Sequence, residues 1–395
     1  MTDVSMAVYV SNLLFLTSNQ LSTIMDSNQQ AILKTSENAL QAKAAAVRAG
    51  YYDDAFLAPF ATLARGRRPP YVQPIIKRGT HARVCCIDRM LCSFVQLVVE
   101  QHEARLDEKE AMDEGNDDVD EQEQEEECVV QIVVLGCGKD TIFFRNQEVL
   151  TRNSAMTLKW FEVDHPPMIQ EKANTVAANP DVFDNVNVNK VDSDTYEIEP
   201  SIGVSCVFLG HDLREEGVME KLQRAGCAPN TPTLFILECV LMYLPDNDSQ
   251  TLLQSIAASY RNQAYLCFYE PILGSDAFGN VMENNLSRAG LATPESSLRQ
   301  TRTLHDQLAK VVEKAGWSQA TACDLWHAYD TIVTAAQRQR GNRAEFLDEW
   351  EEFVLIMQHY CFLVAATGPL GDALCQIAPK SLIGFSPGQA EHLKR

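Results

Sequence analysis

Apolar residues follow two different patterns along the chain, and the change comes near residue 128. Before it, apolar side chains recur at helical spacing, most clearly from Arg83 to Glu100. An alanine-rich segment over residues 34–49 also predicts a helix, with Gly50 as its stop. From Cys128 onward, short apolar runs without alternation predict strands buried on both faces. The five runs are CVVQIVVL at 128–135, LKWFEV at 158–163, VSCVFL at 204–209, TLFIL at 233–237 and AYLCFY at 264–269.

Helix-like segments separate these runs, at residues 168–177, 218–225 and 248–260. Strands that alternate with helices are typical of a parallel α/β sheet with crossover connections. The last third, residues 298–366, contains two long helical patterns and an aromatic-rich run at 353–364. We therefore expect an α/β fold whose ligand binds at the carboxyl ends of the strands.

Negative charge is concentrated in one segment. The 395 residues carry a net charge of −21, and the fifteen acids and two bases between Glu100 and Glu127 account for 13 of that excess. Like charges without aromatic residues predict a solvated, disordered insertion. The overall charge also argues against nucleic acid or an anionic membrane as a partner, because both are polyanions.

Cysteine placement and the N-terminus indicate a cytoplasmic protein. The twelve cysteines form no CxxC pair, and several lie in apolar runs, where a free thiol packs as a small hydrophobe. The apolar stretch at residues 7–16 is too short to span a bilayer, and no basic residue precedes Lys34. The histidines are scattered without a zinc motif, so we expect no metal.

Glycines or acids follow four of the predicted strands. Gly136 and Gly138 follow the first strand, where glycine lets the backbone approach a ligand closely. Asp164 follows the second and can accept hydrogen bonds from ribose hydroxyls, and Asp212 follows the third, where it can accept from an adenine amino group. Glu238 closes the fourth, in apolar surroundings that make an unpartnered carboxylate costly. Each position taken alone is also compatible with a turn, loop or helix-cap role.

Together these positions suit a nucleoside-containing cofactor, either S-adenosylmethionine or a nicotinamide dinucleotide. The chain has no GK[ST] sequence, which argues against a P-loop, and no GxSxG, which argues against a hydrolase nucleophile.

With these residues the chain resembles the leucine carboxyl methyltransferases. These S-adenosylmethionine-dependent enzymes methylate the C-terminal leucine carboxylate of type 2A protein phosphatase catalytic subunits. The resemblance runs from about Glu37 to Thr367. The blocks that carry it are Lys43 with Gly50-Tyr51, RGTHARV at 78–84, LGCGKDT at 135–141 with Phe144-Arg145, FEVDHP at 161–166, DLR at 212–214, PTLFILECVLMYL at 232–244, YEPILGSDAFGNVM at 269–282, and EFLDEWE at 345–351 with HYC at 359–361.

The resemblance implies a Rossmann-like class I methyltransferase fold with four segments. Residues 1–33 would be a variable extension and residues 34–99 a helical lid. Residues 100–127 would be the acidic insertion, and residues 128–395 the methyltransferase domain, with substrate-binding additions in its C-terminal third.

The resemblance also implies roles for individual residues in binding S-adenosylmethionine. Lys43 and Arg83 would hold the methionine carboxylate, Gly136 would admit the cofactor, and Asp164 would bind the ribose. Asp212 and Leu213 would bind the adenine, and Glu238 would lie near the methionyl part. Two positions depart from the family pattern, because Ala44 replaces a basic residue and His165 replaces an aromatic one.

For the reaction we expect in-line displacement without a general base, since the acceptor carboxylate is already ionised at pH 7. Arg83 and the Tyr243 hydroxyl would position that carboxylate. Three alternatives stay open: a wybutosine-type tRNA carboxyl methyltransferase, a small-molecule O-methyltransferase, and a non-catalytic binding module. The tRNA branch of the family carries a further C-terminal repeat domain, which this chain is not expected to have.

Overall fold

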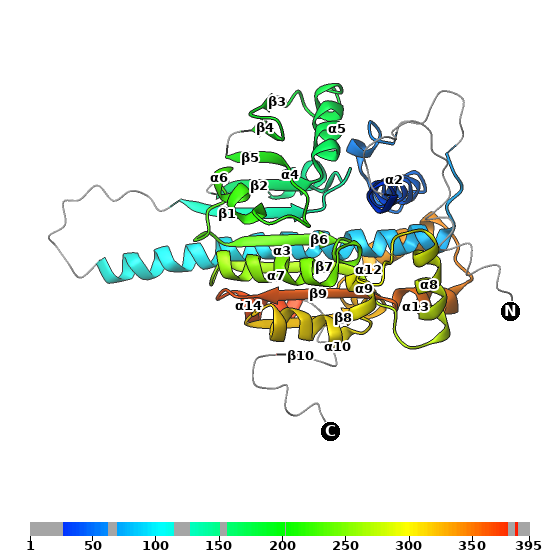
Figure 1. The fold of residues 1–395 in the computed structure, drawn as a ribbon. Helices are drawn as coiled ribbons and strands as arrows, with labels where there is room; N and C mark the ends of the chain where they lie inside the picture. The colour runs from blue at the N-terminus through cyan, green and yellow to red at the C-terminus, as the bar shows by residue number, and fades with distance from the viewer. Residues whose placement is uncertain are drawn as a thin grey trace.

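A sheet of ten strands forms the centre of the part of the chain described by the computed structural model (Figure 1). That part comprises residues 27–61, 69–113, 127–150, 156–201, 203–377 and 384–385. Across the sheet the order is β10-β8-β9-β7-β6-β1-β2-β5-β4-β3. The strands are β1 (Cys128–Leu135), β2 (Met156–Asp164), β3 (Asn187–Lys190), β4 (Thr195–Ser201), β5 (Val204–Gly210), β6 (Thr233–Glu238), β7 (Ala264–Pro271), β8 (Gln319–Asp324), β9 (Tyr360–Ala366) and β10 (Gly384–Phe385).

The middle of the sheet is parallel and its two sides are antiparallel. Strands β7, β6, β1, β2 and β5 pair in parallel, and these are the five predicted from apolar runs. Strands β9, β8 and β10 extend the sheet antiparallel on one side, and β4 and β3 do so on the other. The parallel strands therefore end at the same edge, which faces α2 in Figure 1.

Helices cover both faces of this sheet. In the first half of the chain they are α2 (Ser27–Arg48), η1 (Ala55–Leu57), α3 (Pro74–Asp113), α4 (Ile142–Leu150), α5 (Pro166–Ala177), α6 (Val218–Arg224), η2 (Leu241–Tyr243) and α7 (Asp246–Ser259). In the second half they are α8 (Ala277–Arg288), α9 (Ser297–Gln300), α10 (Leu304–Leu308), the π-helical turn η3 (Ala309–Lys314), α11 (Leu325–Thr331), α12 (Ala335–Ala344), α13 (Trp350–Met357) and α14 (Gly371–Ile377).

Two apolar cores explain why the parallel strands lack alternation. Ile132 of β1 packs in one core with Phe94 of α3, whereas the adjacent Val133 packs in the other core with Leu253 of α7. Successive side chains of a strand point to opposite faces, so a sheet covered on both sides needs apolar residues at every position.

Helix α3 corrects two expectations about domain organisation. Its residues Cys86, Met90 and Phe94 are fully buried in the same core as β1, so α3 belongs to the sheet domain and not to a separate lid ending at residue 99. The helix also continues to Asp113, so the first half of the segment expected to be disordered, residues 100–113, is helical. Glu, Lys, Arg and Ala are good helix formers, which outweighs the repulsion between like charges there. Residues 114–126 lie outside the described residues.

No helix in the described part of the chain is both long and apolar enough to cross a membrane.

Candidate functional site

A cavity at the carboxyl ends of the parallel strands brings together all eight residues predicted for the site. Lys43 comes from α2, Arg83 from α3 and Tyr243 from η2, and the other five lie at the ends of β1, β2, β5 and β6 or in the turns that follow them. The eight predicted residues are among those that line it: Lys43, Arg83, Gly136, Asp164, Asp212, Leu213, Glu238 and Tyr243.

The glycine loop after β1 needs its glycines for conformation and for space. Gly136 adopts a φ of +69°, a backbone region that residues with a side chain rarely enter. A Cβ at this position would lie 2.6 Å from a methyl carbon of Val240, in the turn after β6. The loop and that turn therefore touch, and together they form one wall of the cavity.

Asp164 ends β2 at the floor of the cavity. Its carboxylate accepts backbone N–H groups from Gly138 and His165, each at 2.6 Å. Burial nevertheless raises the pKa of Asp164, because desolvation outweighs these hydrogen bonds. Glu162, the other acid of the same motif, lies fully buried in the strand and pairs with Lys172 at 2.5 Å. Of the two acids, only Asp164 lines the cavity.

Asp212, after β5, is shared between two side chains. His165 Nε2 lies 3.1 Å from Asp212 Oδ2, and Arg214 donates Nε to Oδ1 at 2.9 Å. Burial opposes the charge of Asp212, but these hydrogen bonds hold the pKa of its carboxyl well below the usual range. The bond to Asp212 also raises the pKa of His165. His165, the departure from the family pattern, thus links the expected ribose side of the cavity to its expected adenine side.

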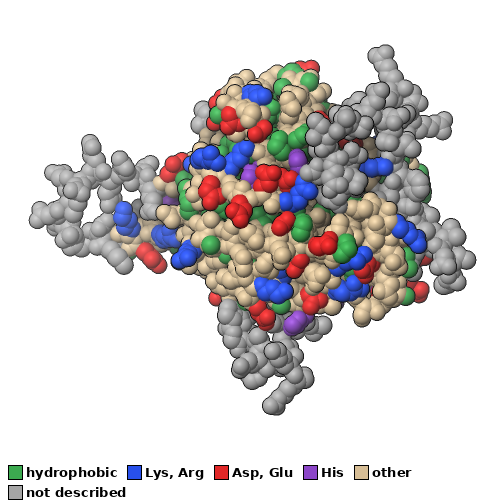
Figure 2. Space-filling view, viewed as in Figure 1, with side chains coloured by type: hydrophobic (Ala, Val, Ile, Leu, Met, Phe, Trp, Pro, Cys, Tyr) green, Lys and Arg blue, Asp and Glu red, His purple; other side chains and the backbone are tan. Residues whose placement is uncertain are grey.

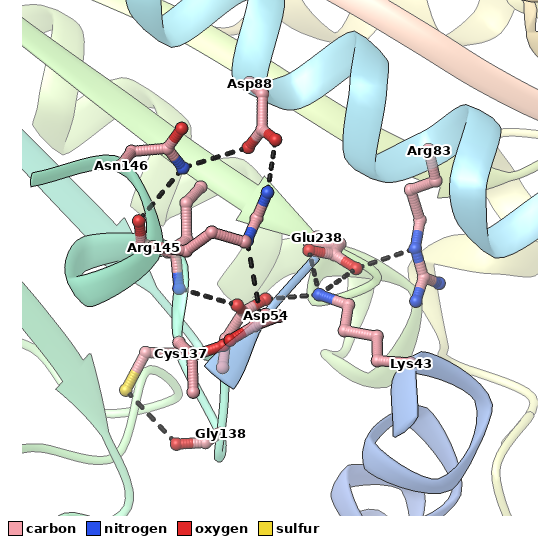
Figure 3. Close-up of polar contacts among 12 residues, drawn as sticks. Lys43, Asp54, Arg83, Asp88, Cys137, Gly138, Arg145, Asn146 and Glu238 are labelled. Atoms are coloured by element: carbon pink, nitrogen blue, oxygen red, sulfur yellow. Dashed lines mark hydrogen bonds and ion pairs between the residues drawn. The ribbon is translucent and has the colours of Figure 1, made fainter. Parts of the chain in front are cut away.

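Two cations meet at Glu238. Lys43 Nζ lies 2.9 Å and Arg83 Nε 2.7 Å from Glu238 Oε1, and in Figure 3 they reach it from two different helices. Burial opposes the charge of Arg83, but Glu238 beside it raises the pKa of the guanidinium. Lys43 also pairs with Asp140 of the glycine loop. Because the acids Asp140 and Glu238 balance the bases Lys43 and Arg83, this part of the cavity is close to neutral.

Three consecutive loop residues contact the N-terminal segment, and none of them was among the predicted site residues. Lys139 pairs with Glu37 of α2, Asp140 pairs with Lys43 of α2, and the Thr141 hydroxyl donates to Asp54 at 2.6 Å. All three residues lie in the LGCGKDT block that carries part of the resemblance, and that block was the sequence signal that could have identified them. The first two contacts hold α2, and the third holds the start of η1, against the edge where the parallel strands end.

A second, mainly apolar cavity adjoins the first. Both are lined by Thr35, Ala39, Arg83, Cys239 and Tyr243, so these residues form the boundary between them. Burial raises the pKa of the Tyr243 phenol, so its hydroxyl is protonated at neutral pH and can donate a hydrogen bond. The aliphatic side chains of the second cavity include Val72, Ile76, Met242, Leu286, Leu291 and Ile356.

Among the described residues, no group of three or more His, Cys, Asp or Glu side chains is arranged to hold a metal ion.

The strand order and the strand-end cavity define a Rossmann-like α/β fold of the class I methyltransferase type. Residues 115–257 match the family model described as leucine carboxyl methyltransferase. This segment is therefore similar to the leucine carboxyl methyltransferases, in agreement with the resemblance seen in the sequence. This match and the strand order agree in indicating a methyltransferase fold.

Full-length relatives extend this match. Leucine carboxyl methyltransferase 1 of Bos taurus is 28% identical over 353 residues, covering 87% of this chain and 92% of that protein. Its namesake in Schizosaccharomyces pombe is 27% identical over 343 residues, covering 87% and 96%. The tRNA wybutosine-synthesizing protein 4 of Rattus norvegicus is 27% identical over 372 residues, covering 90% of this chain but 48% of that protein.

Likeness to solved structures is distant. One titled "PigF with SAH" has a TM-score of 0.34 and 11% identity, covering 60% of this chain and 50% of that one. Because this TM-score is low, the fold assignment rests on the strand order and not on this likeness.

Proposed function

We propose that this protein transfers a methyl group from S-adenosylmethionine to the C-terminal leucine carboxylate of a type 2A protein phosphatase catalytic subunit. The observation that carries this proposal is the pair of adjoining cavities with Arg83 and Tyr243 on their boundary. One cavity offers strand-end acids and cations, and the other offers aliphatic side chains.

The first cavity fits the parts of the donor. Lys43 and Arg83 would bind the carboxylate of the methionyl part, and Glu238 would lie near the same part. Asp164 would bind the ribose. Asp212 and Leu213 would bind the adenine. The Gly136 backbone would allow close approach, because a side chain there has no room. When bound, S-adenosylmethionine supplies an electrophilic methyl group on a sulfonium.

The boundary residues would position the acceptor. Arg83 Nε lies at ion-pair distance from Glu238, and the two terminal nitrogens of the guanidinium carry four N–H donors that suit a carboxylate. Tyr243 adds a protonated hydroxyl. An ionised carboxylate needs no general base, so these residues act by fixing its direction and by excluding water. The aliphatic second cavity would receive the leucine side chain.

One comparison favours a second candidate, a carboxyl group on a wybutosine-type tRNA base, because the wybutosine-synthesizing relative matches 90% of this chain. Surface charge favours the protein acceptor. The chain carries a net charge of −21, and acidic and basic side chains are interspersed on the face drawn in Figure 2. Binding to tRNA depends mainly on neutralising phosphates with basic side chains.

A panel of acceptors tests the proposal. Labelled S-adenosylmethionine is incubated with peptides that end in leucine carboxylate, leucine amide or aspartate, and with tRNA. We expect label on the leucine carboxylate peptide alone. Label on tRNA, or equal label on the leucine and aspartate peptides, would contradict the proposed acceptor.

A further inference from the structure

The turn that follows β6 is conformationally strained. Cys239 has a φ of +55°, in the left-handed region that disfavours residues with a side chain. Such a residue persists only where its surroundings determine the conformation, and the strain is then part of the site's construction. This turn lies between Glu238 and Tyr243, two of the predicted site residues.

Four successive amides of the turn donate to the end of β7. The N–H of Cys239 donates to the Tyr269 carbonyl at 2.8 Å. Those of Val240 and Leu241 each donate at 2.8 Å to Glu270 Oε1, and that of Met242 donates at 3.1 Å to Oε2. One carboxylate therefore binds three consecutive backbone groups.

Glu270 has no other evident purpose in the fold. Its side chain is 1% exposed, and within the described part of the chain no lysine or arginine lies at ion-pair distance from it. A buried carboxylate without such a cation is costly. A leucine or methionine would fill this core position without that cost, so the amides of the turn account for the glutamate.

The turn itself touches both cavities. Cys239 and Tyr243 line the two of them, and Val240 packs against Gly136 of the glycine loop. A shift of this turn would move Tyr243 at the boundary between the cavities. It would also change the contact between Val240 and the glycine loop.

We propose that Glu270 is a positioning residue for methyl transfer, which acts through the backbone of residues 239–242 to hold Tyr243 at the boundary between the cavities. This inference deepens the proposed function and rests on it. Glu270 touches neither donor nor acceptor in this account, so it sets the geometry in which the acceptor reacts and contributes little to donor affinity.

The test compares three variants. Glu270→Gln keeps the shape and can accept the bonds of Val240 and Leu241, but its amide group cannot accept the third, from Met242. Glu270→Met removes all three bonds. Gln131→Met is the matched control, because Gln131 is equally buried and makes three hydrogen bonds with Ala228 and Thr233, beside the start of β6, whereas the turn follows the end of β6.

Each variant is assayed for amide hydrogen exchange at residues 239–243, donor affinity, and kcat and KM for a peptide ending in leucine. We expect Glu270→Gln to lower kcat about tenfold and Glu270→Met about a hundredfold, since a misplaced reacting group costs rates of this order. Exchange of the turn amides should accelerate in the same order, and donor affinity should stay within threefold. Gln131→Met should lose stability but keep wild-type kcat and KM.

Unchanged kcat in Glu270→Met, or an equal loss of kcat in Gln131→Met, would overturn the proposal. If the wild-type protein does not methylate the leucine peptide, the proposed function fails on that result alone. Hydrogen exchange then still decides whether Glu270 holds the turn, and unchanged exchange in Glu270→Met would overturn that as well.

Discussion

Arg83 Nε lies 2.7 Å from Glu238 Oε1, so the cation between the two cavities is fixed before any ligand binds. Arg83 comes from a helix buried against the sheet, and Glu238 from the end of a central strand. Both elements are held by the apolar core, so the direction of the guanidinium is set by the fold and not by the ligand.

Replacing Arg83 by alanine should lower kcat/KM for the acceptor by at least about a hundredfold, because the acceptor carboxylate loses its charge-assisted donors. The fold should persist, since Lys43 still pairs with Glu238. Steady-state kinetics with a leucine peptide measures the change. Arg340→Ala is the control, because Arg340 forms an exposed ion pair with Asp53 and such pairs contribute little to stability. Near-normal turnover in Arg83→Ala would show that Arg83 does not position the acceptor carboxylate.

Lys43→Met should weaken binding of S-adenosylhomocysteine about tenfold to a hundredfold while leaving methylthioadenosine unchanged. The first ligand carries the amino-acid carboxylate that Lys43 is expected to hold, and the second lacks it; a charged hydrogen bond is worth about 1.5–3 kcal/mol. Isothermal calorimetry with both ligands gives the comparison. Equal weakening of both ligands would show that Lys43 does not bind the amino-acid carboxylate.

Asp164→Ala should weaken both of those ligands, because each contains the ribose. We expect a loss of about tenfold or more, from one charged hydrogen-bond acceptor. Asp192→Ala provides the control, since Asp192 is exposed and does not line the cavity. The same calorimetry measures both affinities. If Asp164→Ala bound S-adenosylhomocysteine or methylthioadenosine as tightly as the wild-type protein does, Asp164 would not bind the ribose.

Glu270 gives the protein a predictable dependence of stability on pH. Burial raises the pKa of its carboxyl from 4.5 to about 7, against the three amide hydrogen bonds and the charge of Lys310, which lower it. Between these two values the folded state binds more protons than the unfolded state, so stability falls as the pH rises. Relative to Glu270→Gln, the wild-type protein should lose up to about 3 kcal/mol of unfolding free energy from pH 4.5 to pH 7, at roughly 1.4 kcal/mol per pKa unit. Urea titrations at several pH values measure it, and a constant difference between the two proteins would contradict the raised pKa.

The parallel half of the sheet was predictable because its strands are buried on both faces, which leaves a continuous apolar run. Among the antiparallel strands, β3 was missed for the opposite reason. β3 has the sequence NVNK and is largely exposed, so it has no apolar signature. β9 is buried, but it begins within the aromatic-rich run at 353–364, which we did not assign to a strand. Tertiary pairing decides the conformation of such segments.

The strand-end residues were likewise predictable, because parallel strands bring their carboxyl ends to one edge of the sheet. Asp140 and Glu270 were not assigned, although both lie in blocks that carry the resemblance. Asp140 matters through its pairing with Lys43 of α2, and Glu270 through amides of a turn that precedes it by 28–30 residues. Neither contact leaves a local pattern in the sequence.

Mass spectrometry of a type 2A phosphatase catalytic subunit tests the central claim most directly. The intact subunit and a form without its terminal leucine are each incubated with S-adenosylmethionine and this protein, with Arg83→Ala as the inactive control. We predict one added methyl group on the C-terminal carboxylate of the intact subunit and none on the shortened form. Methylation of both forms, or of neither, would contradict the account.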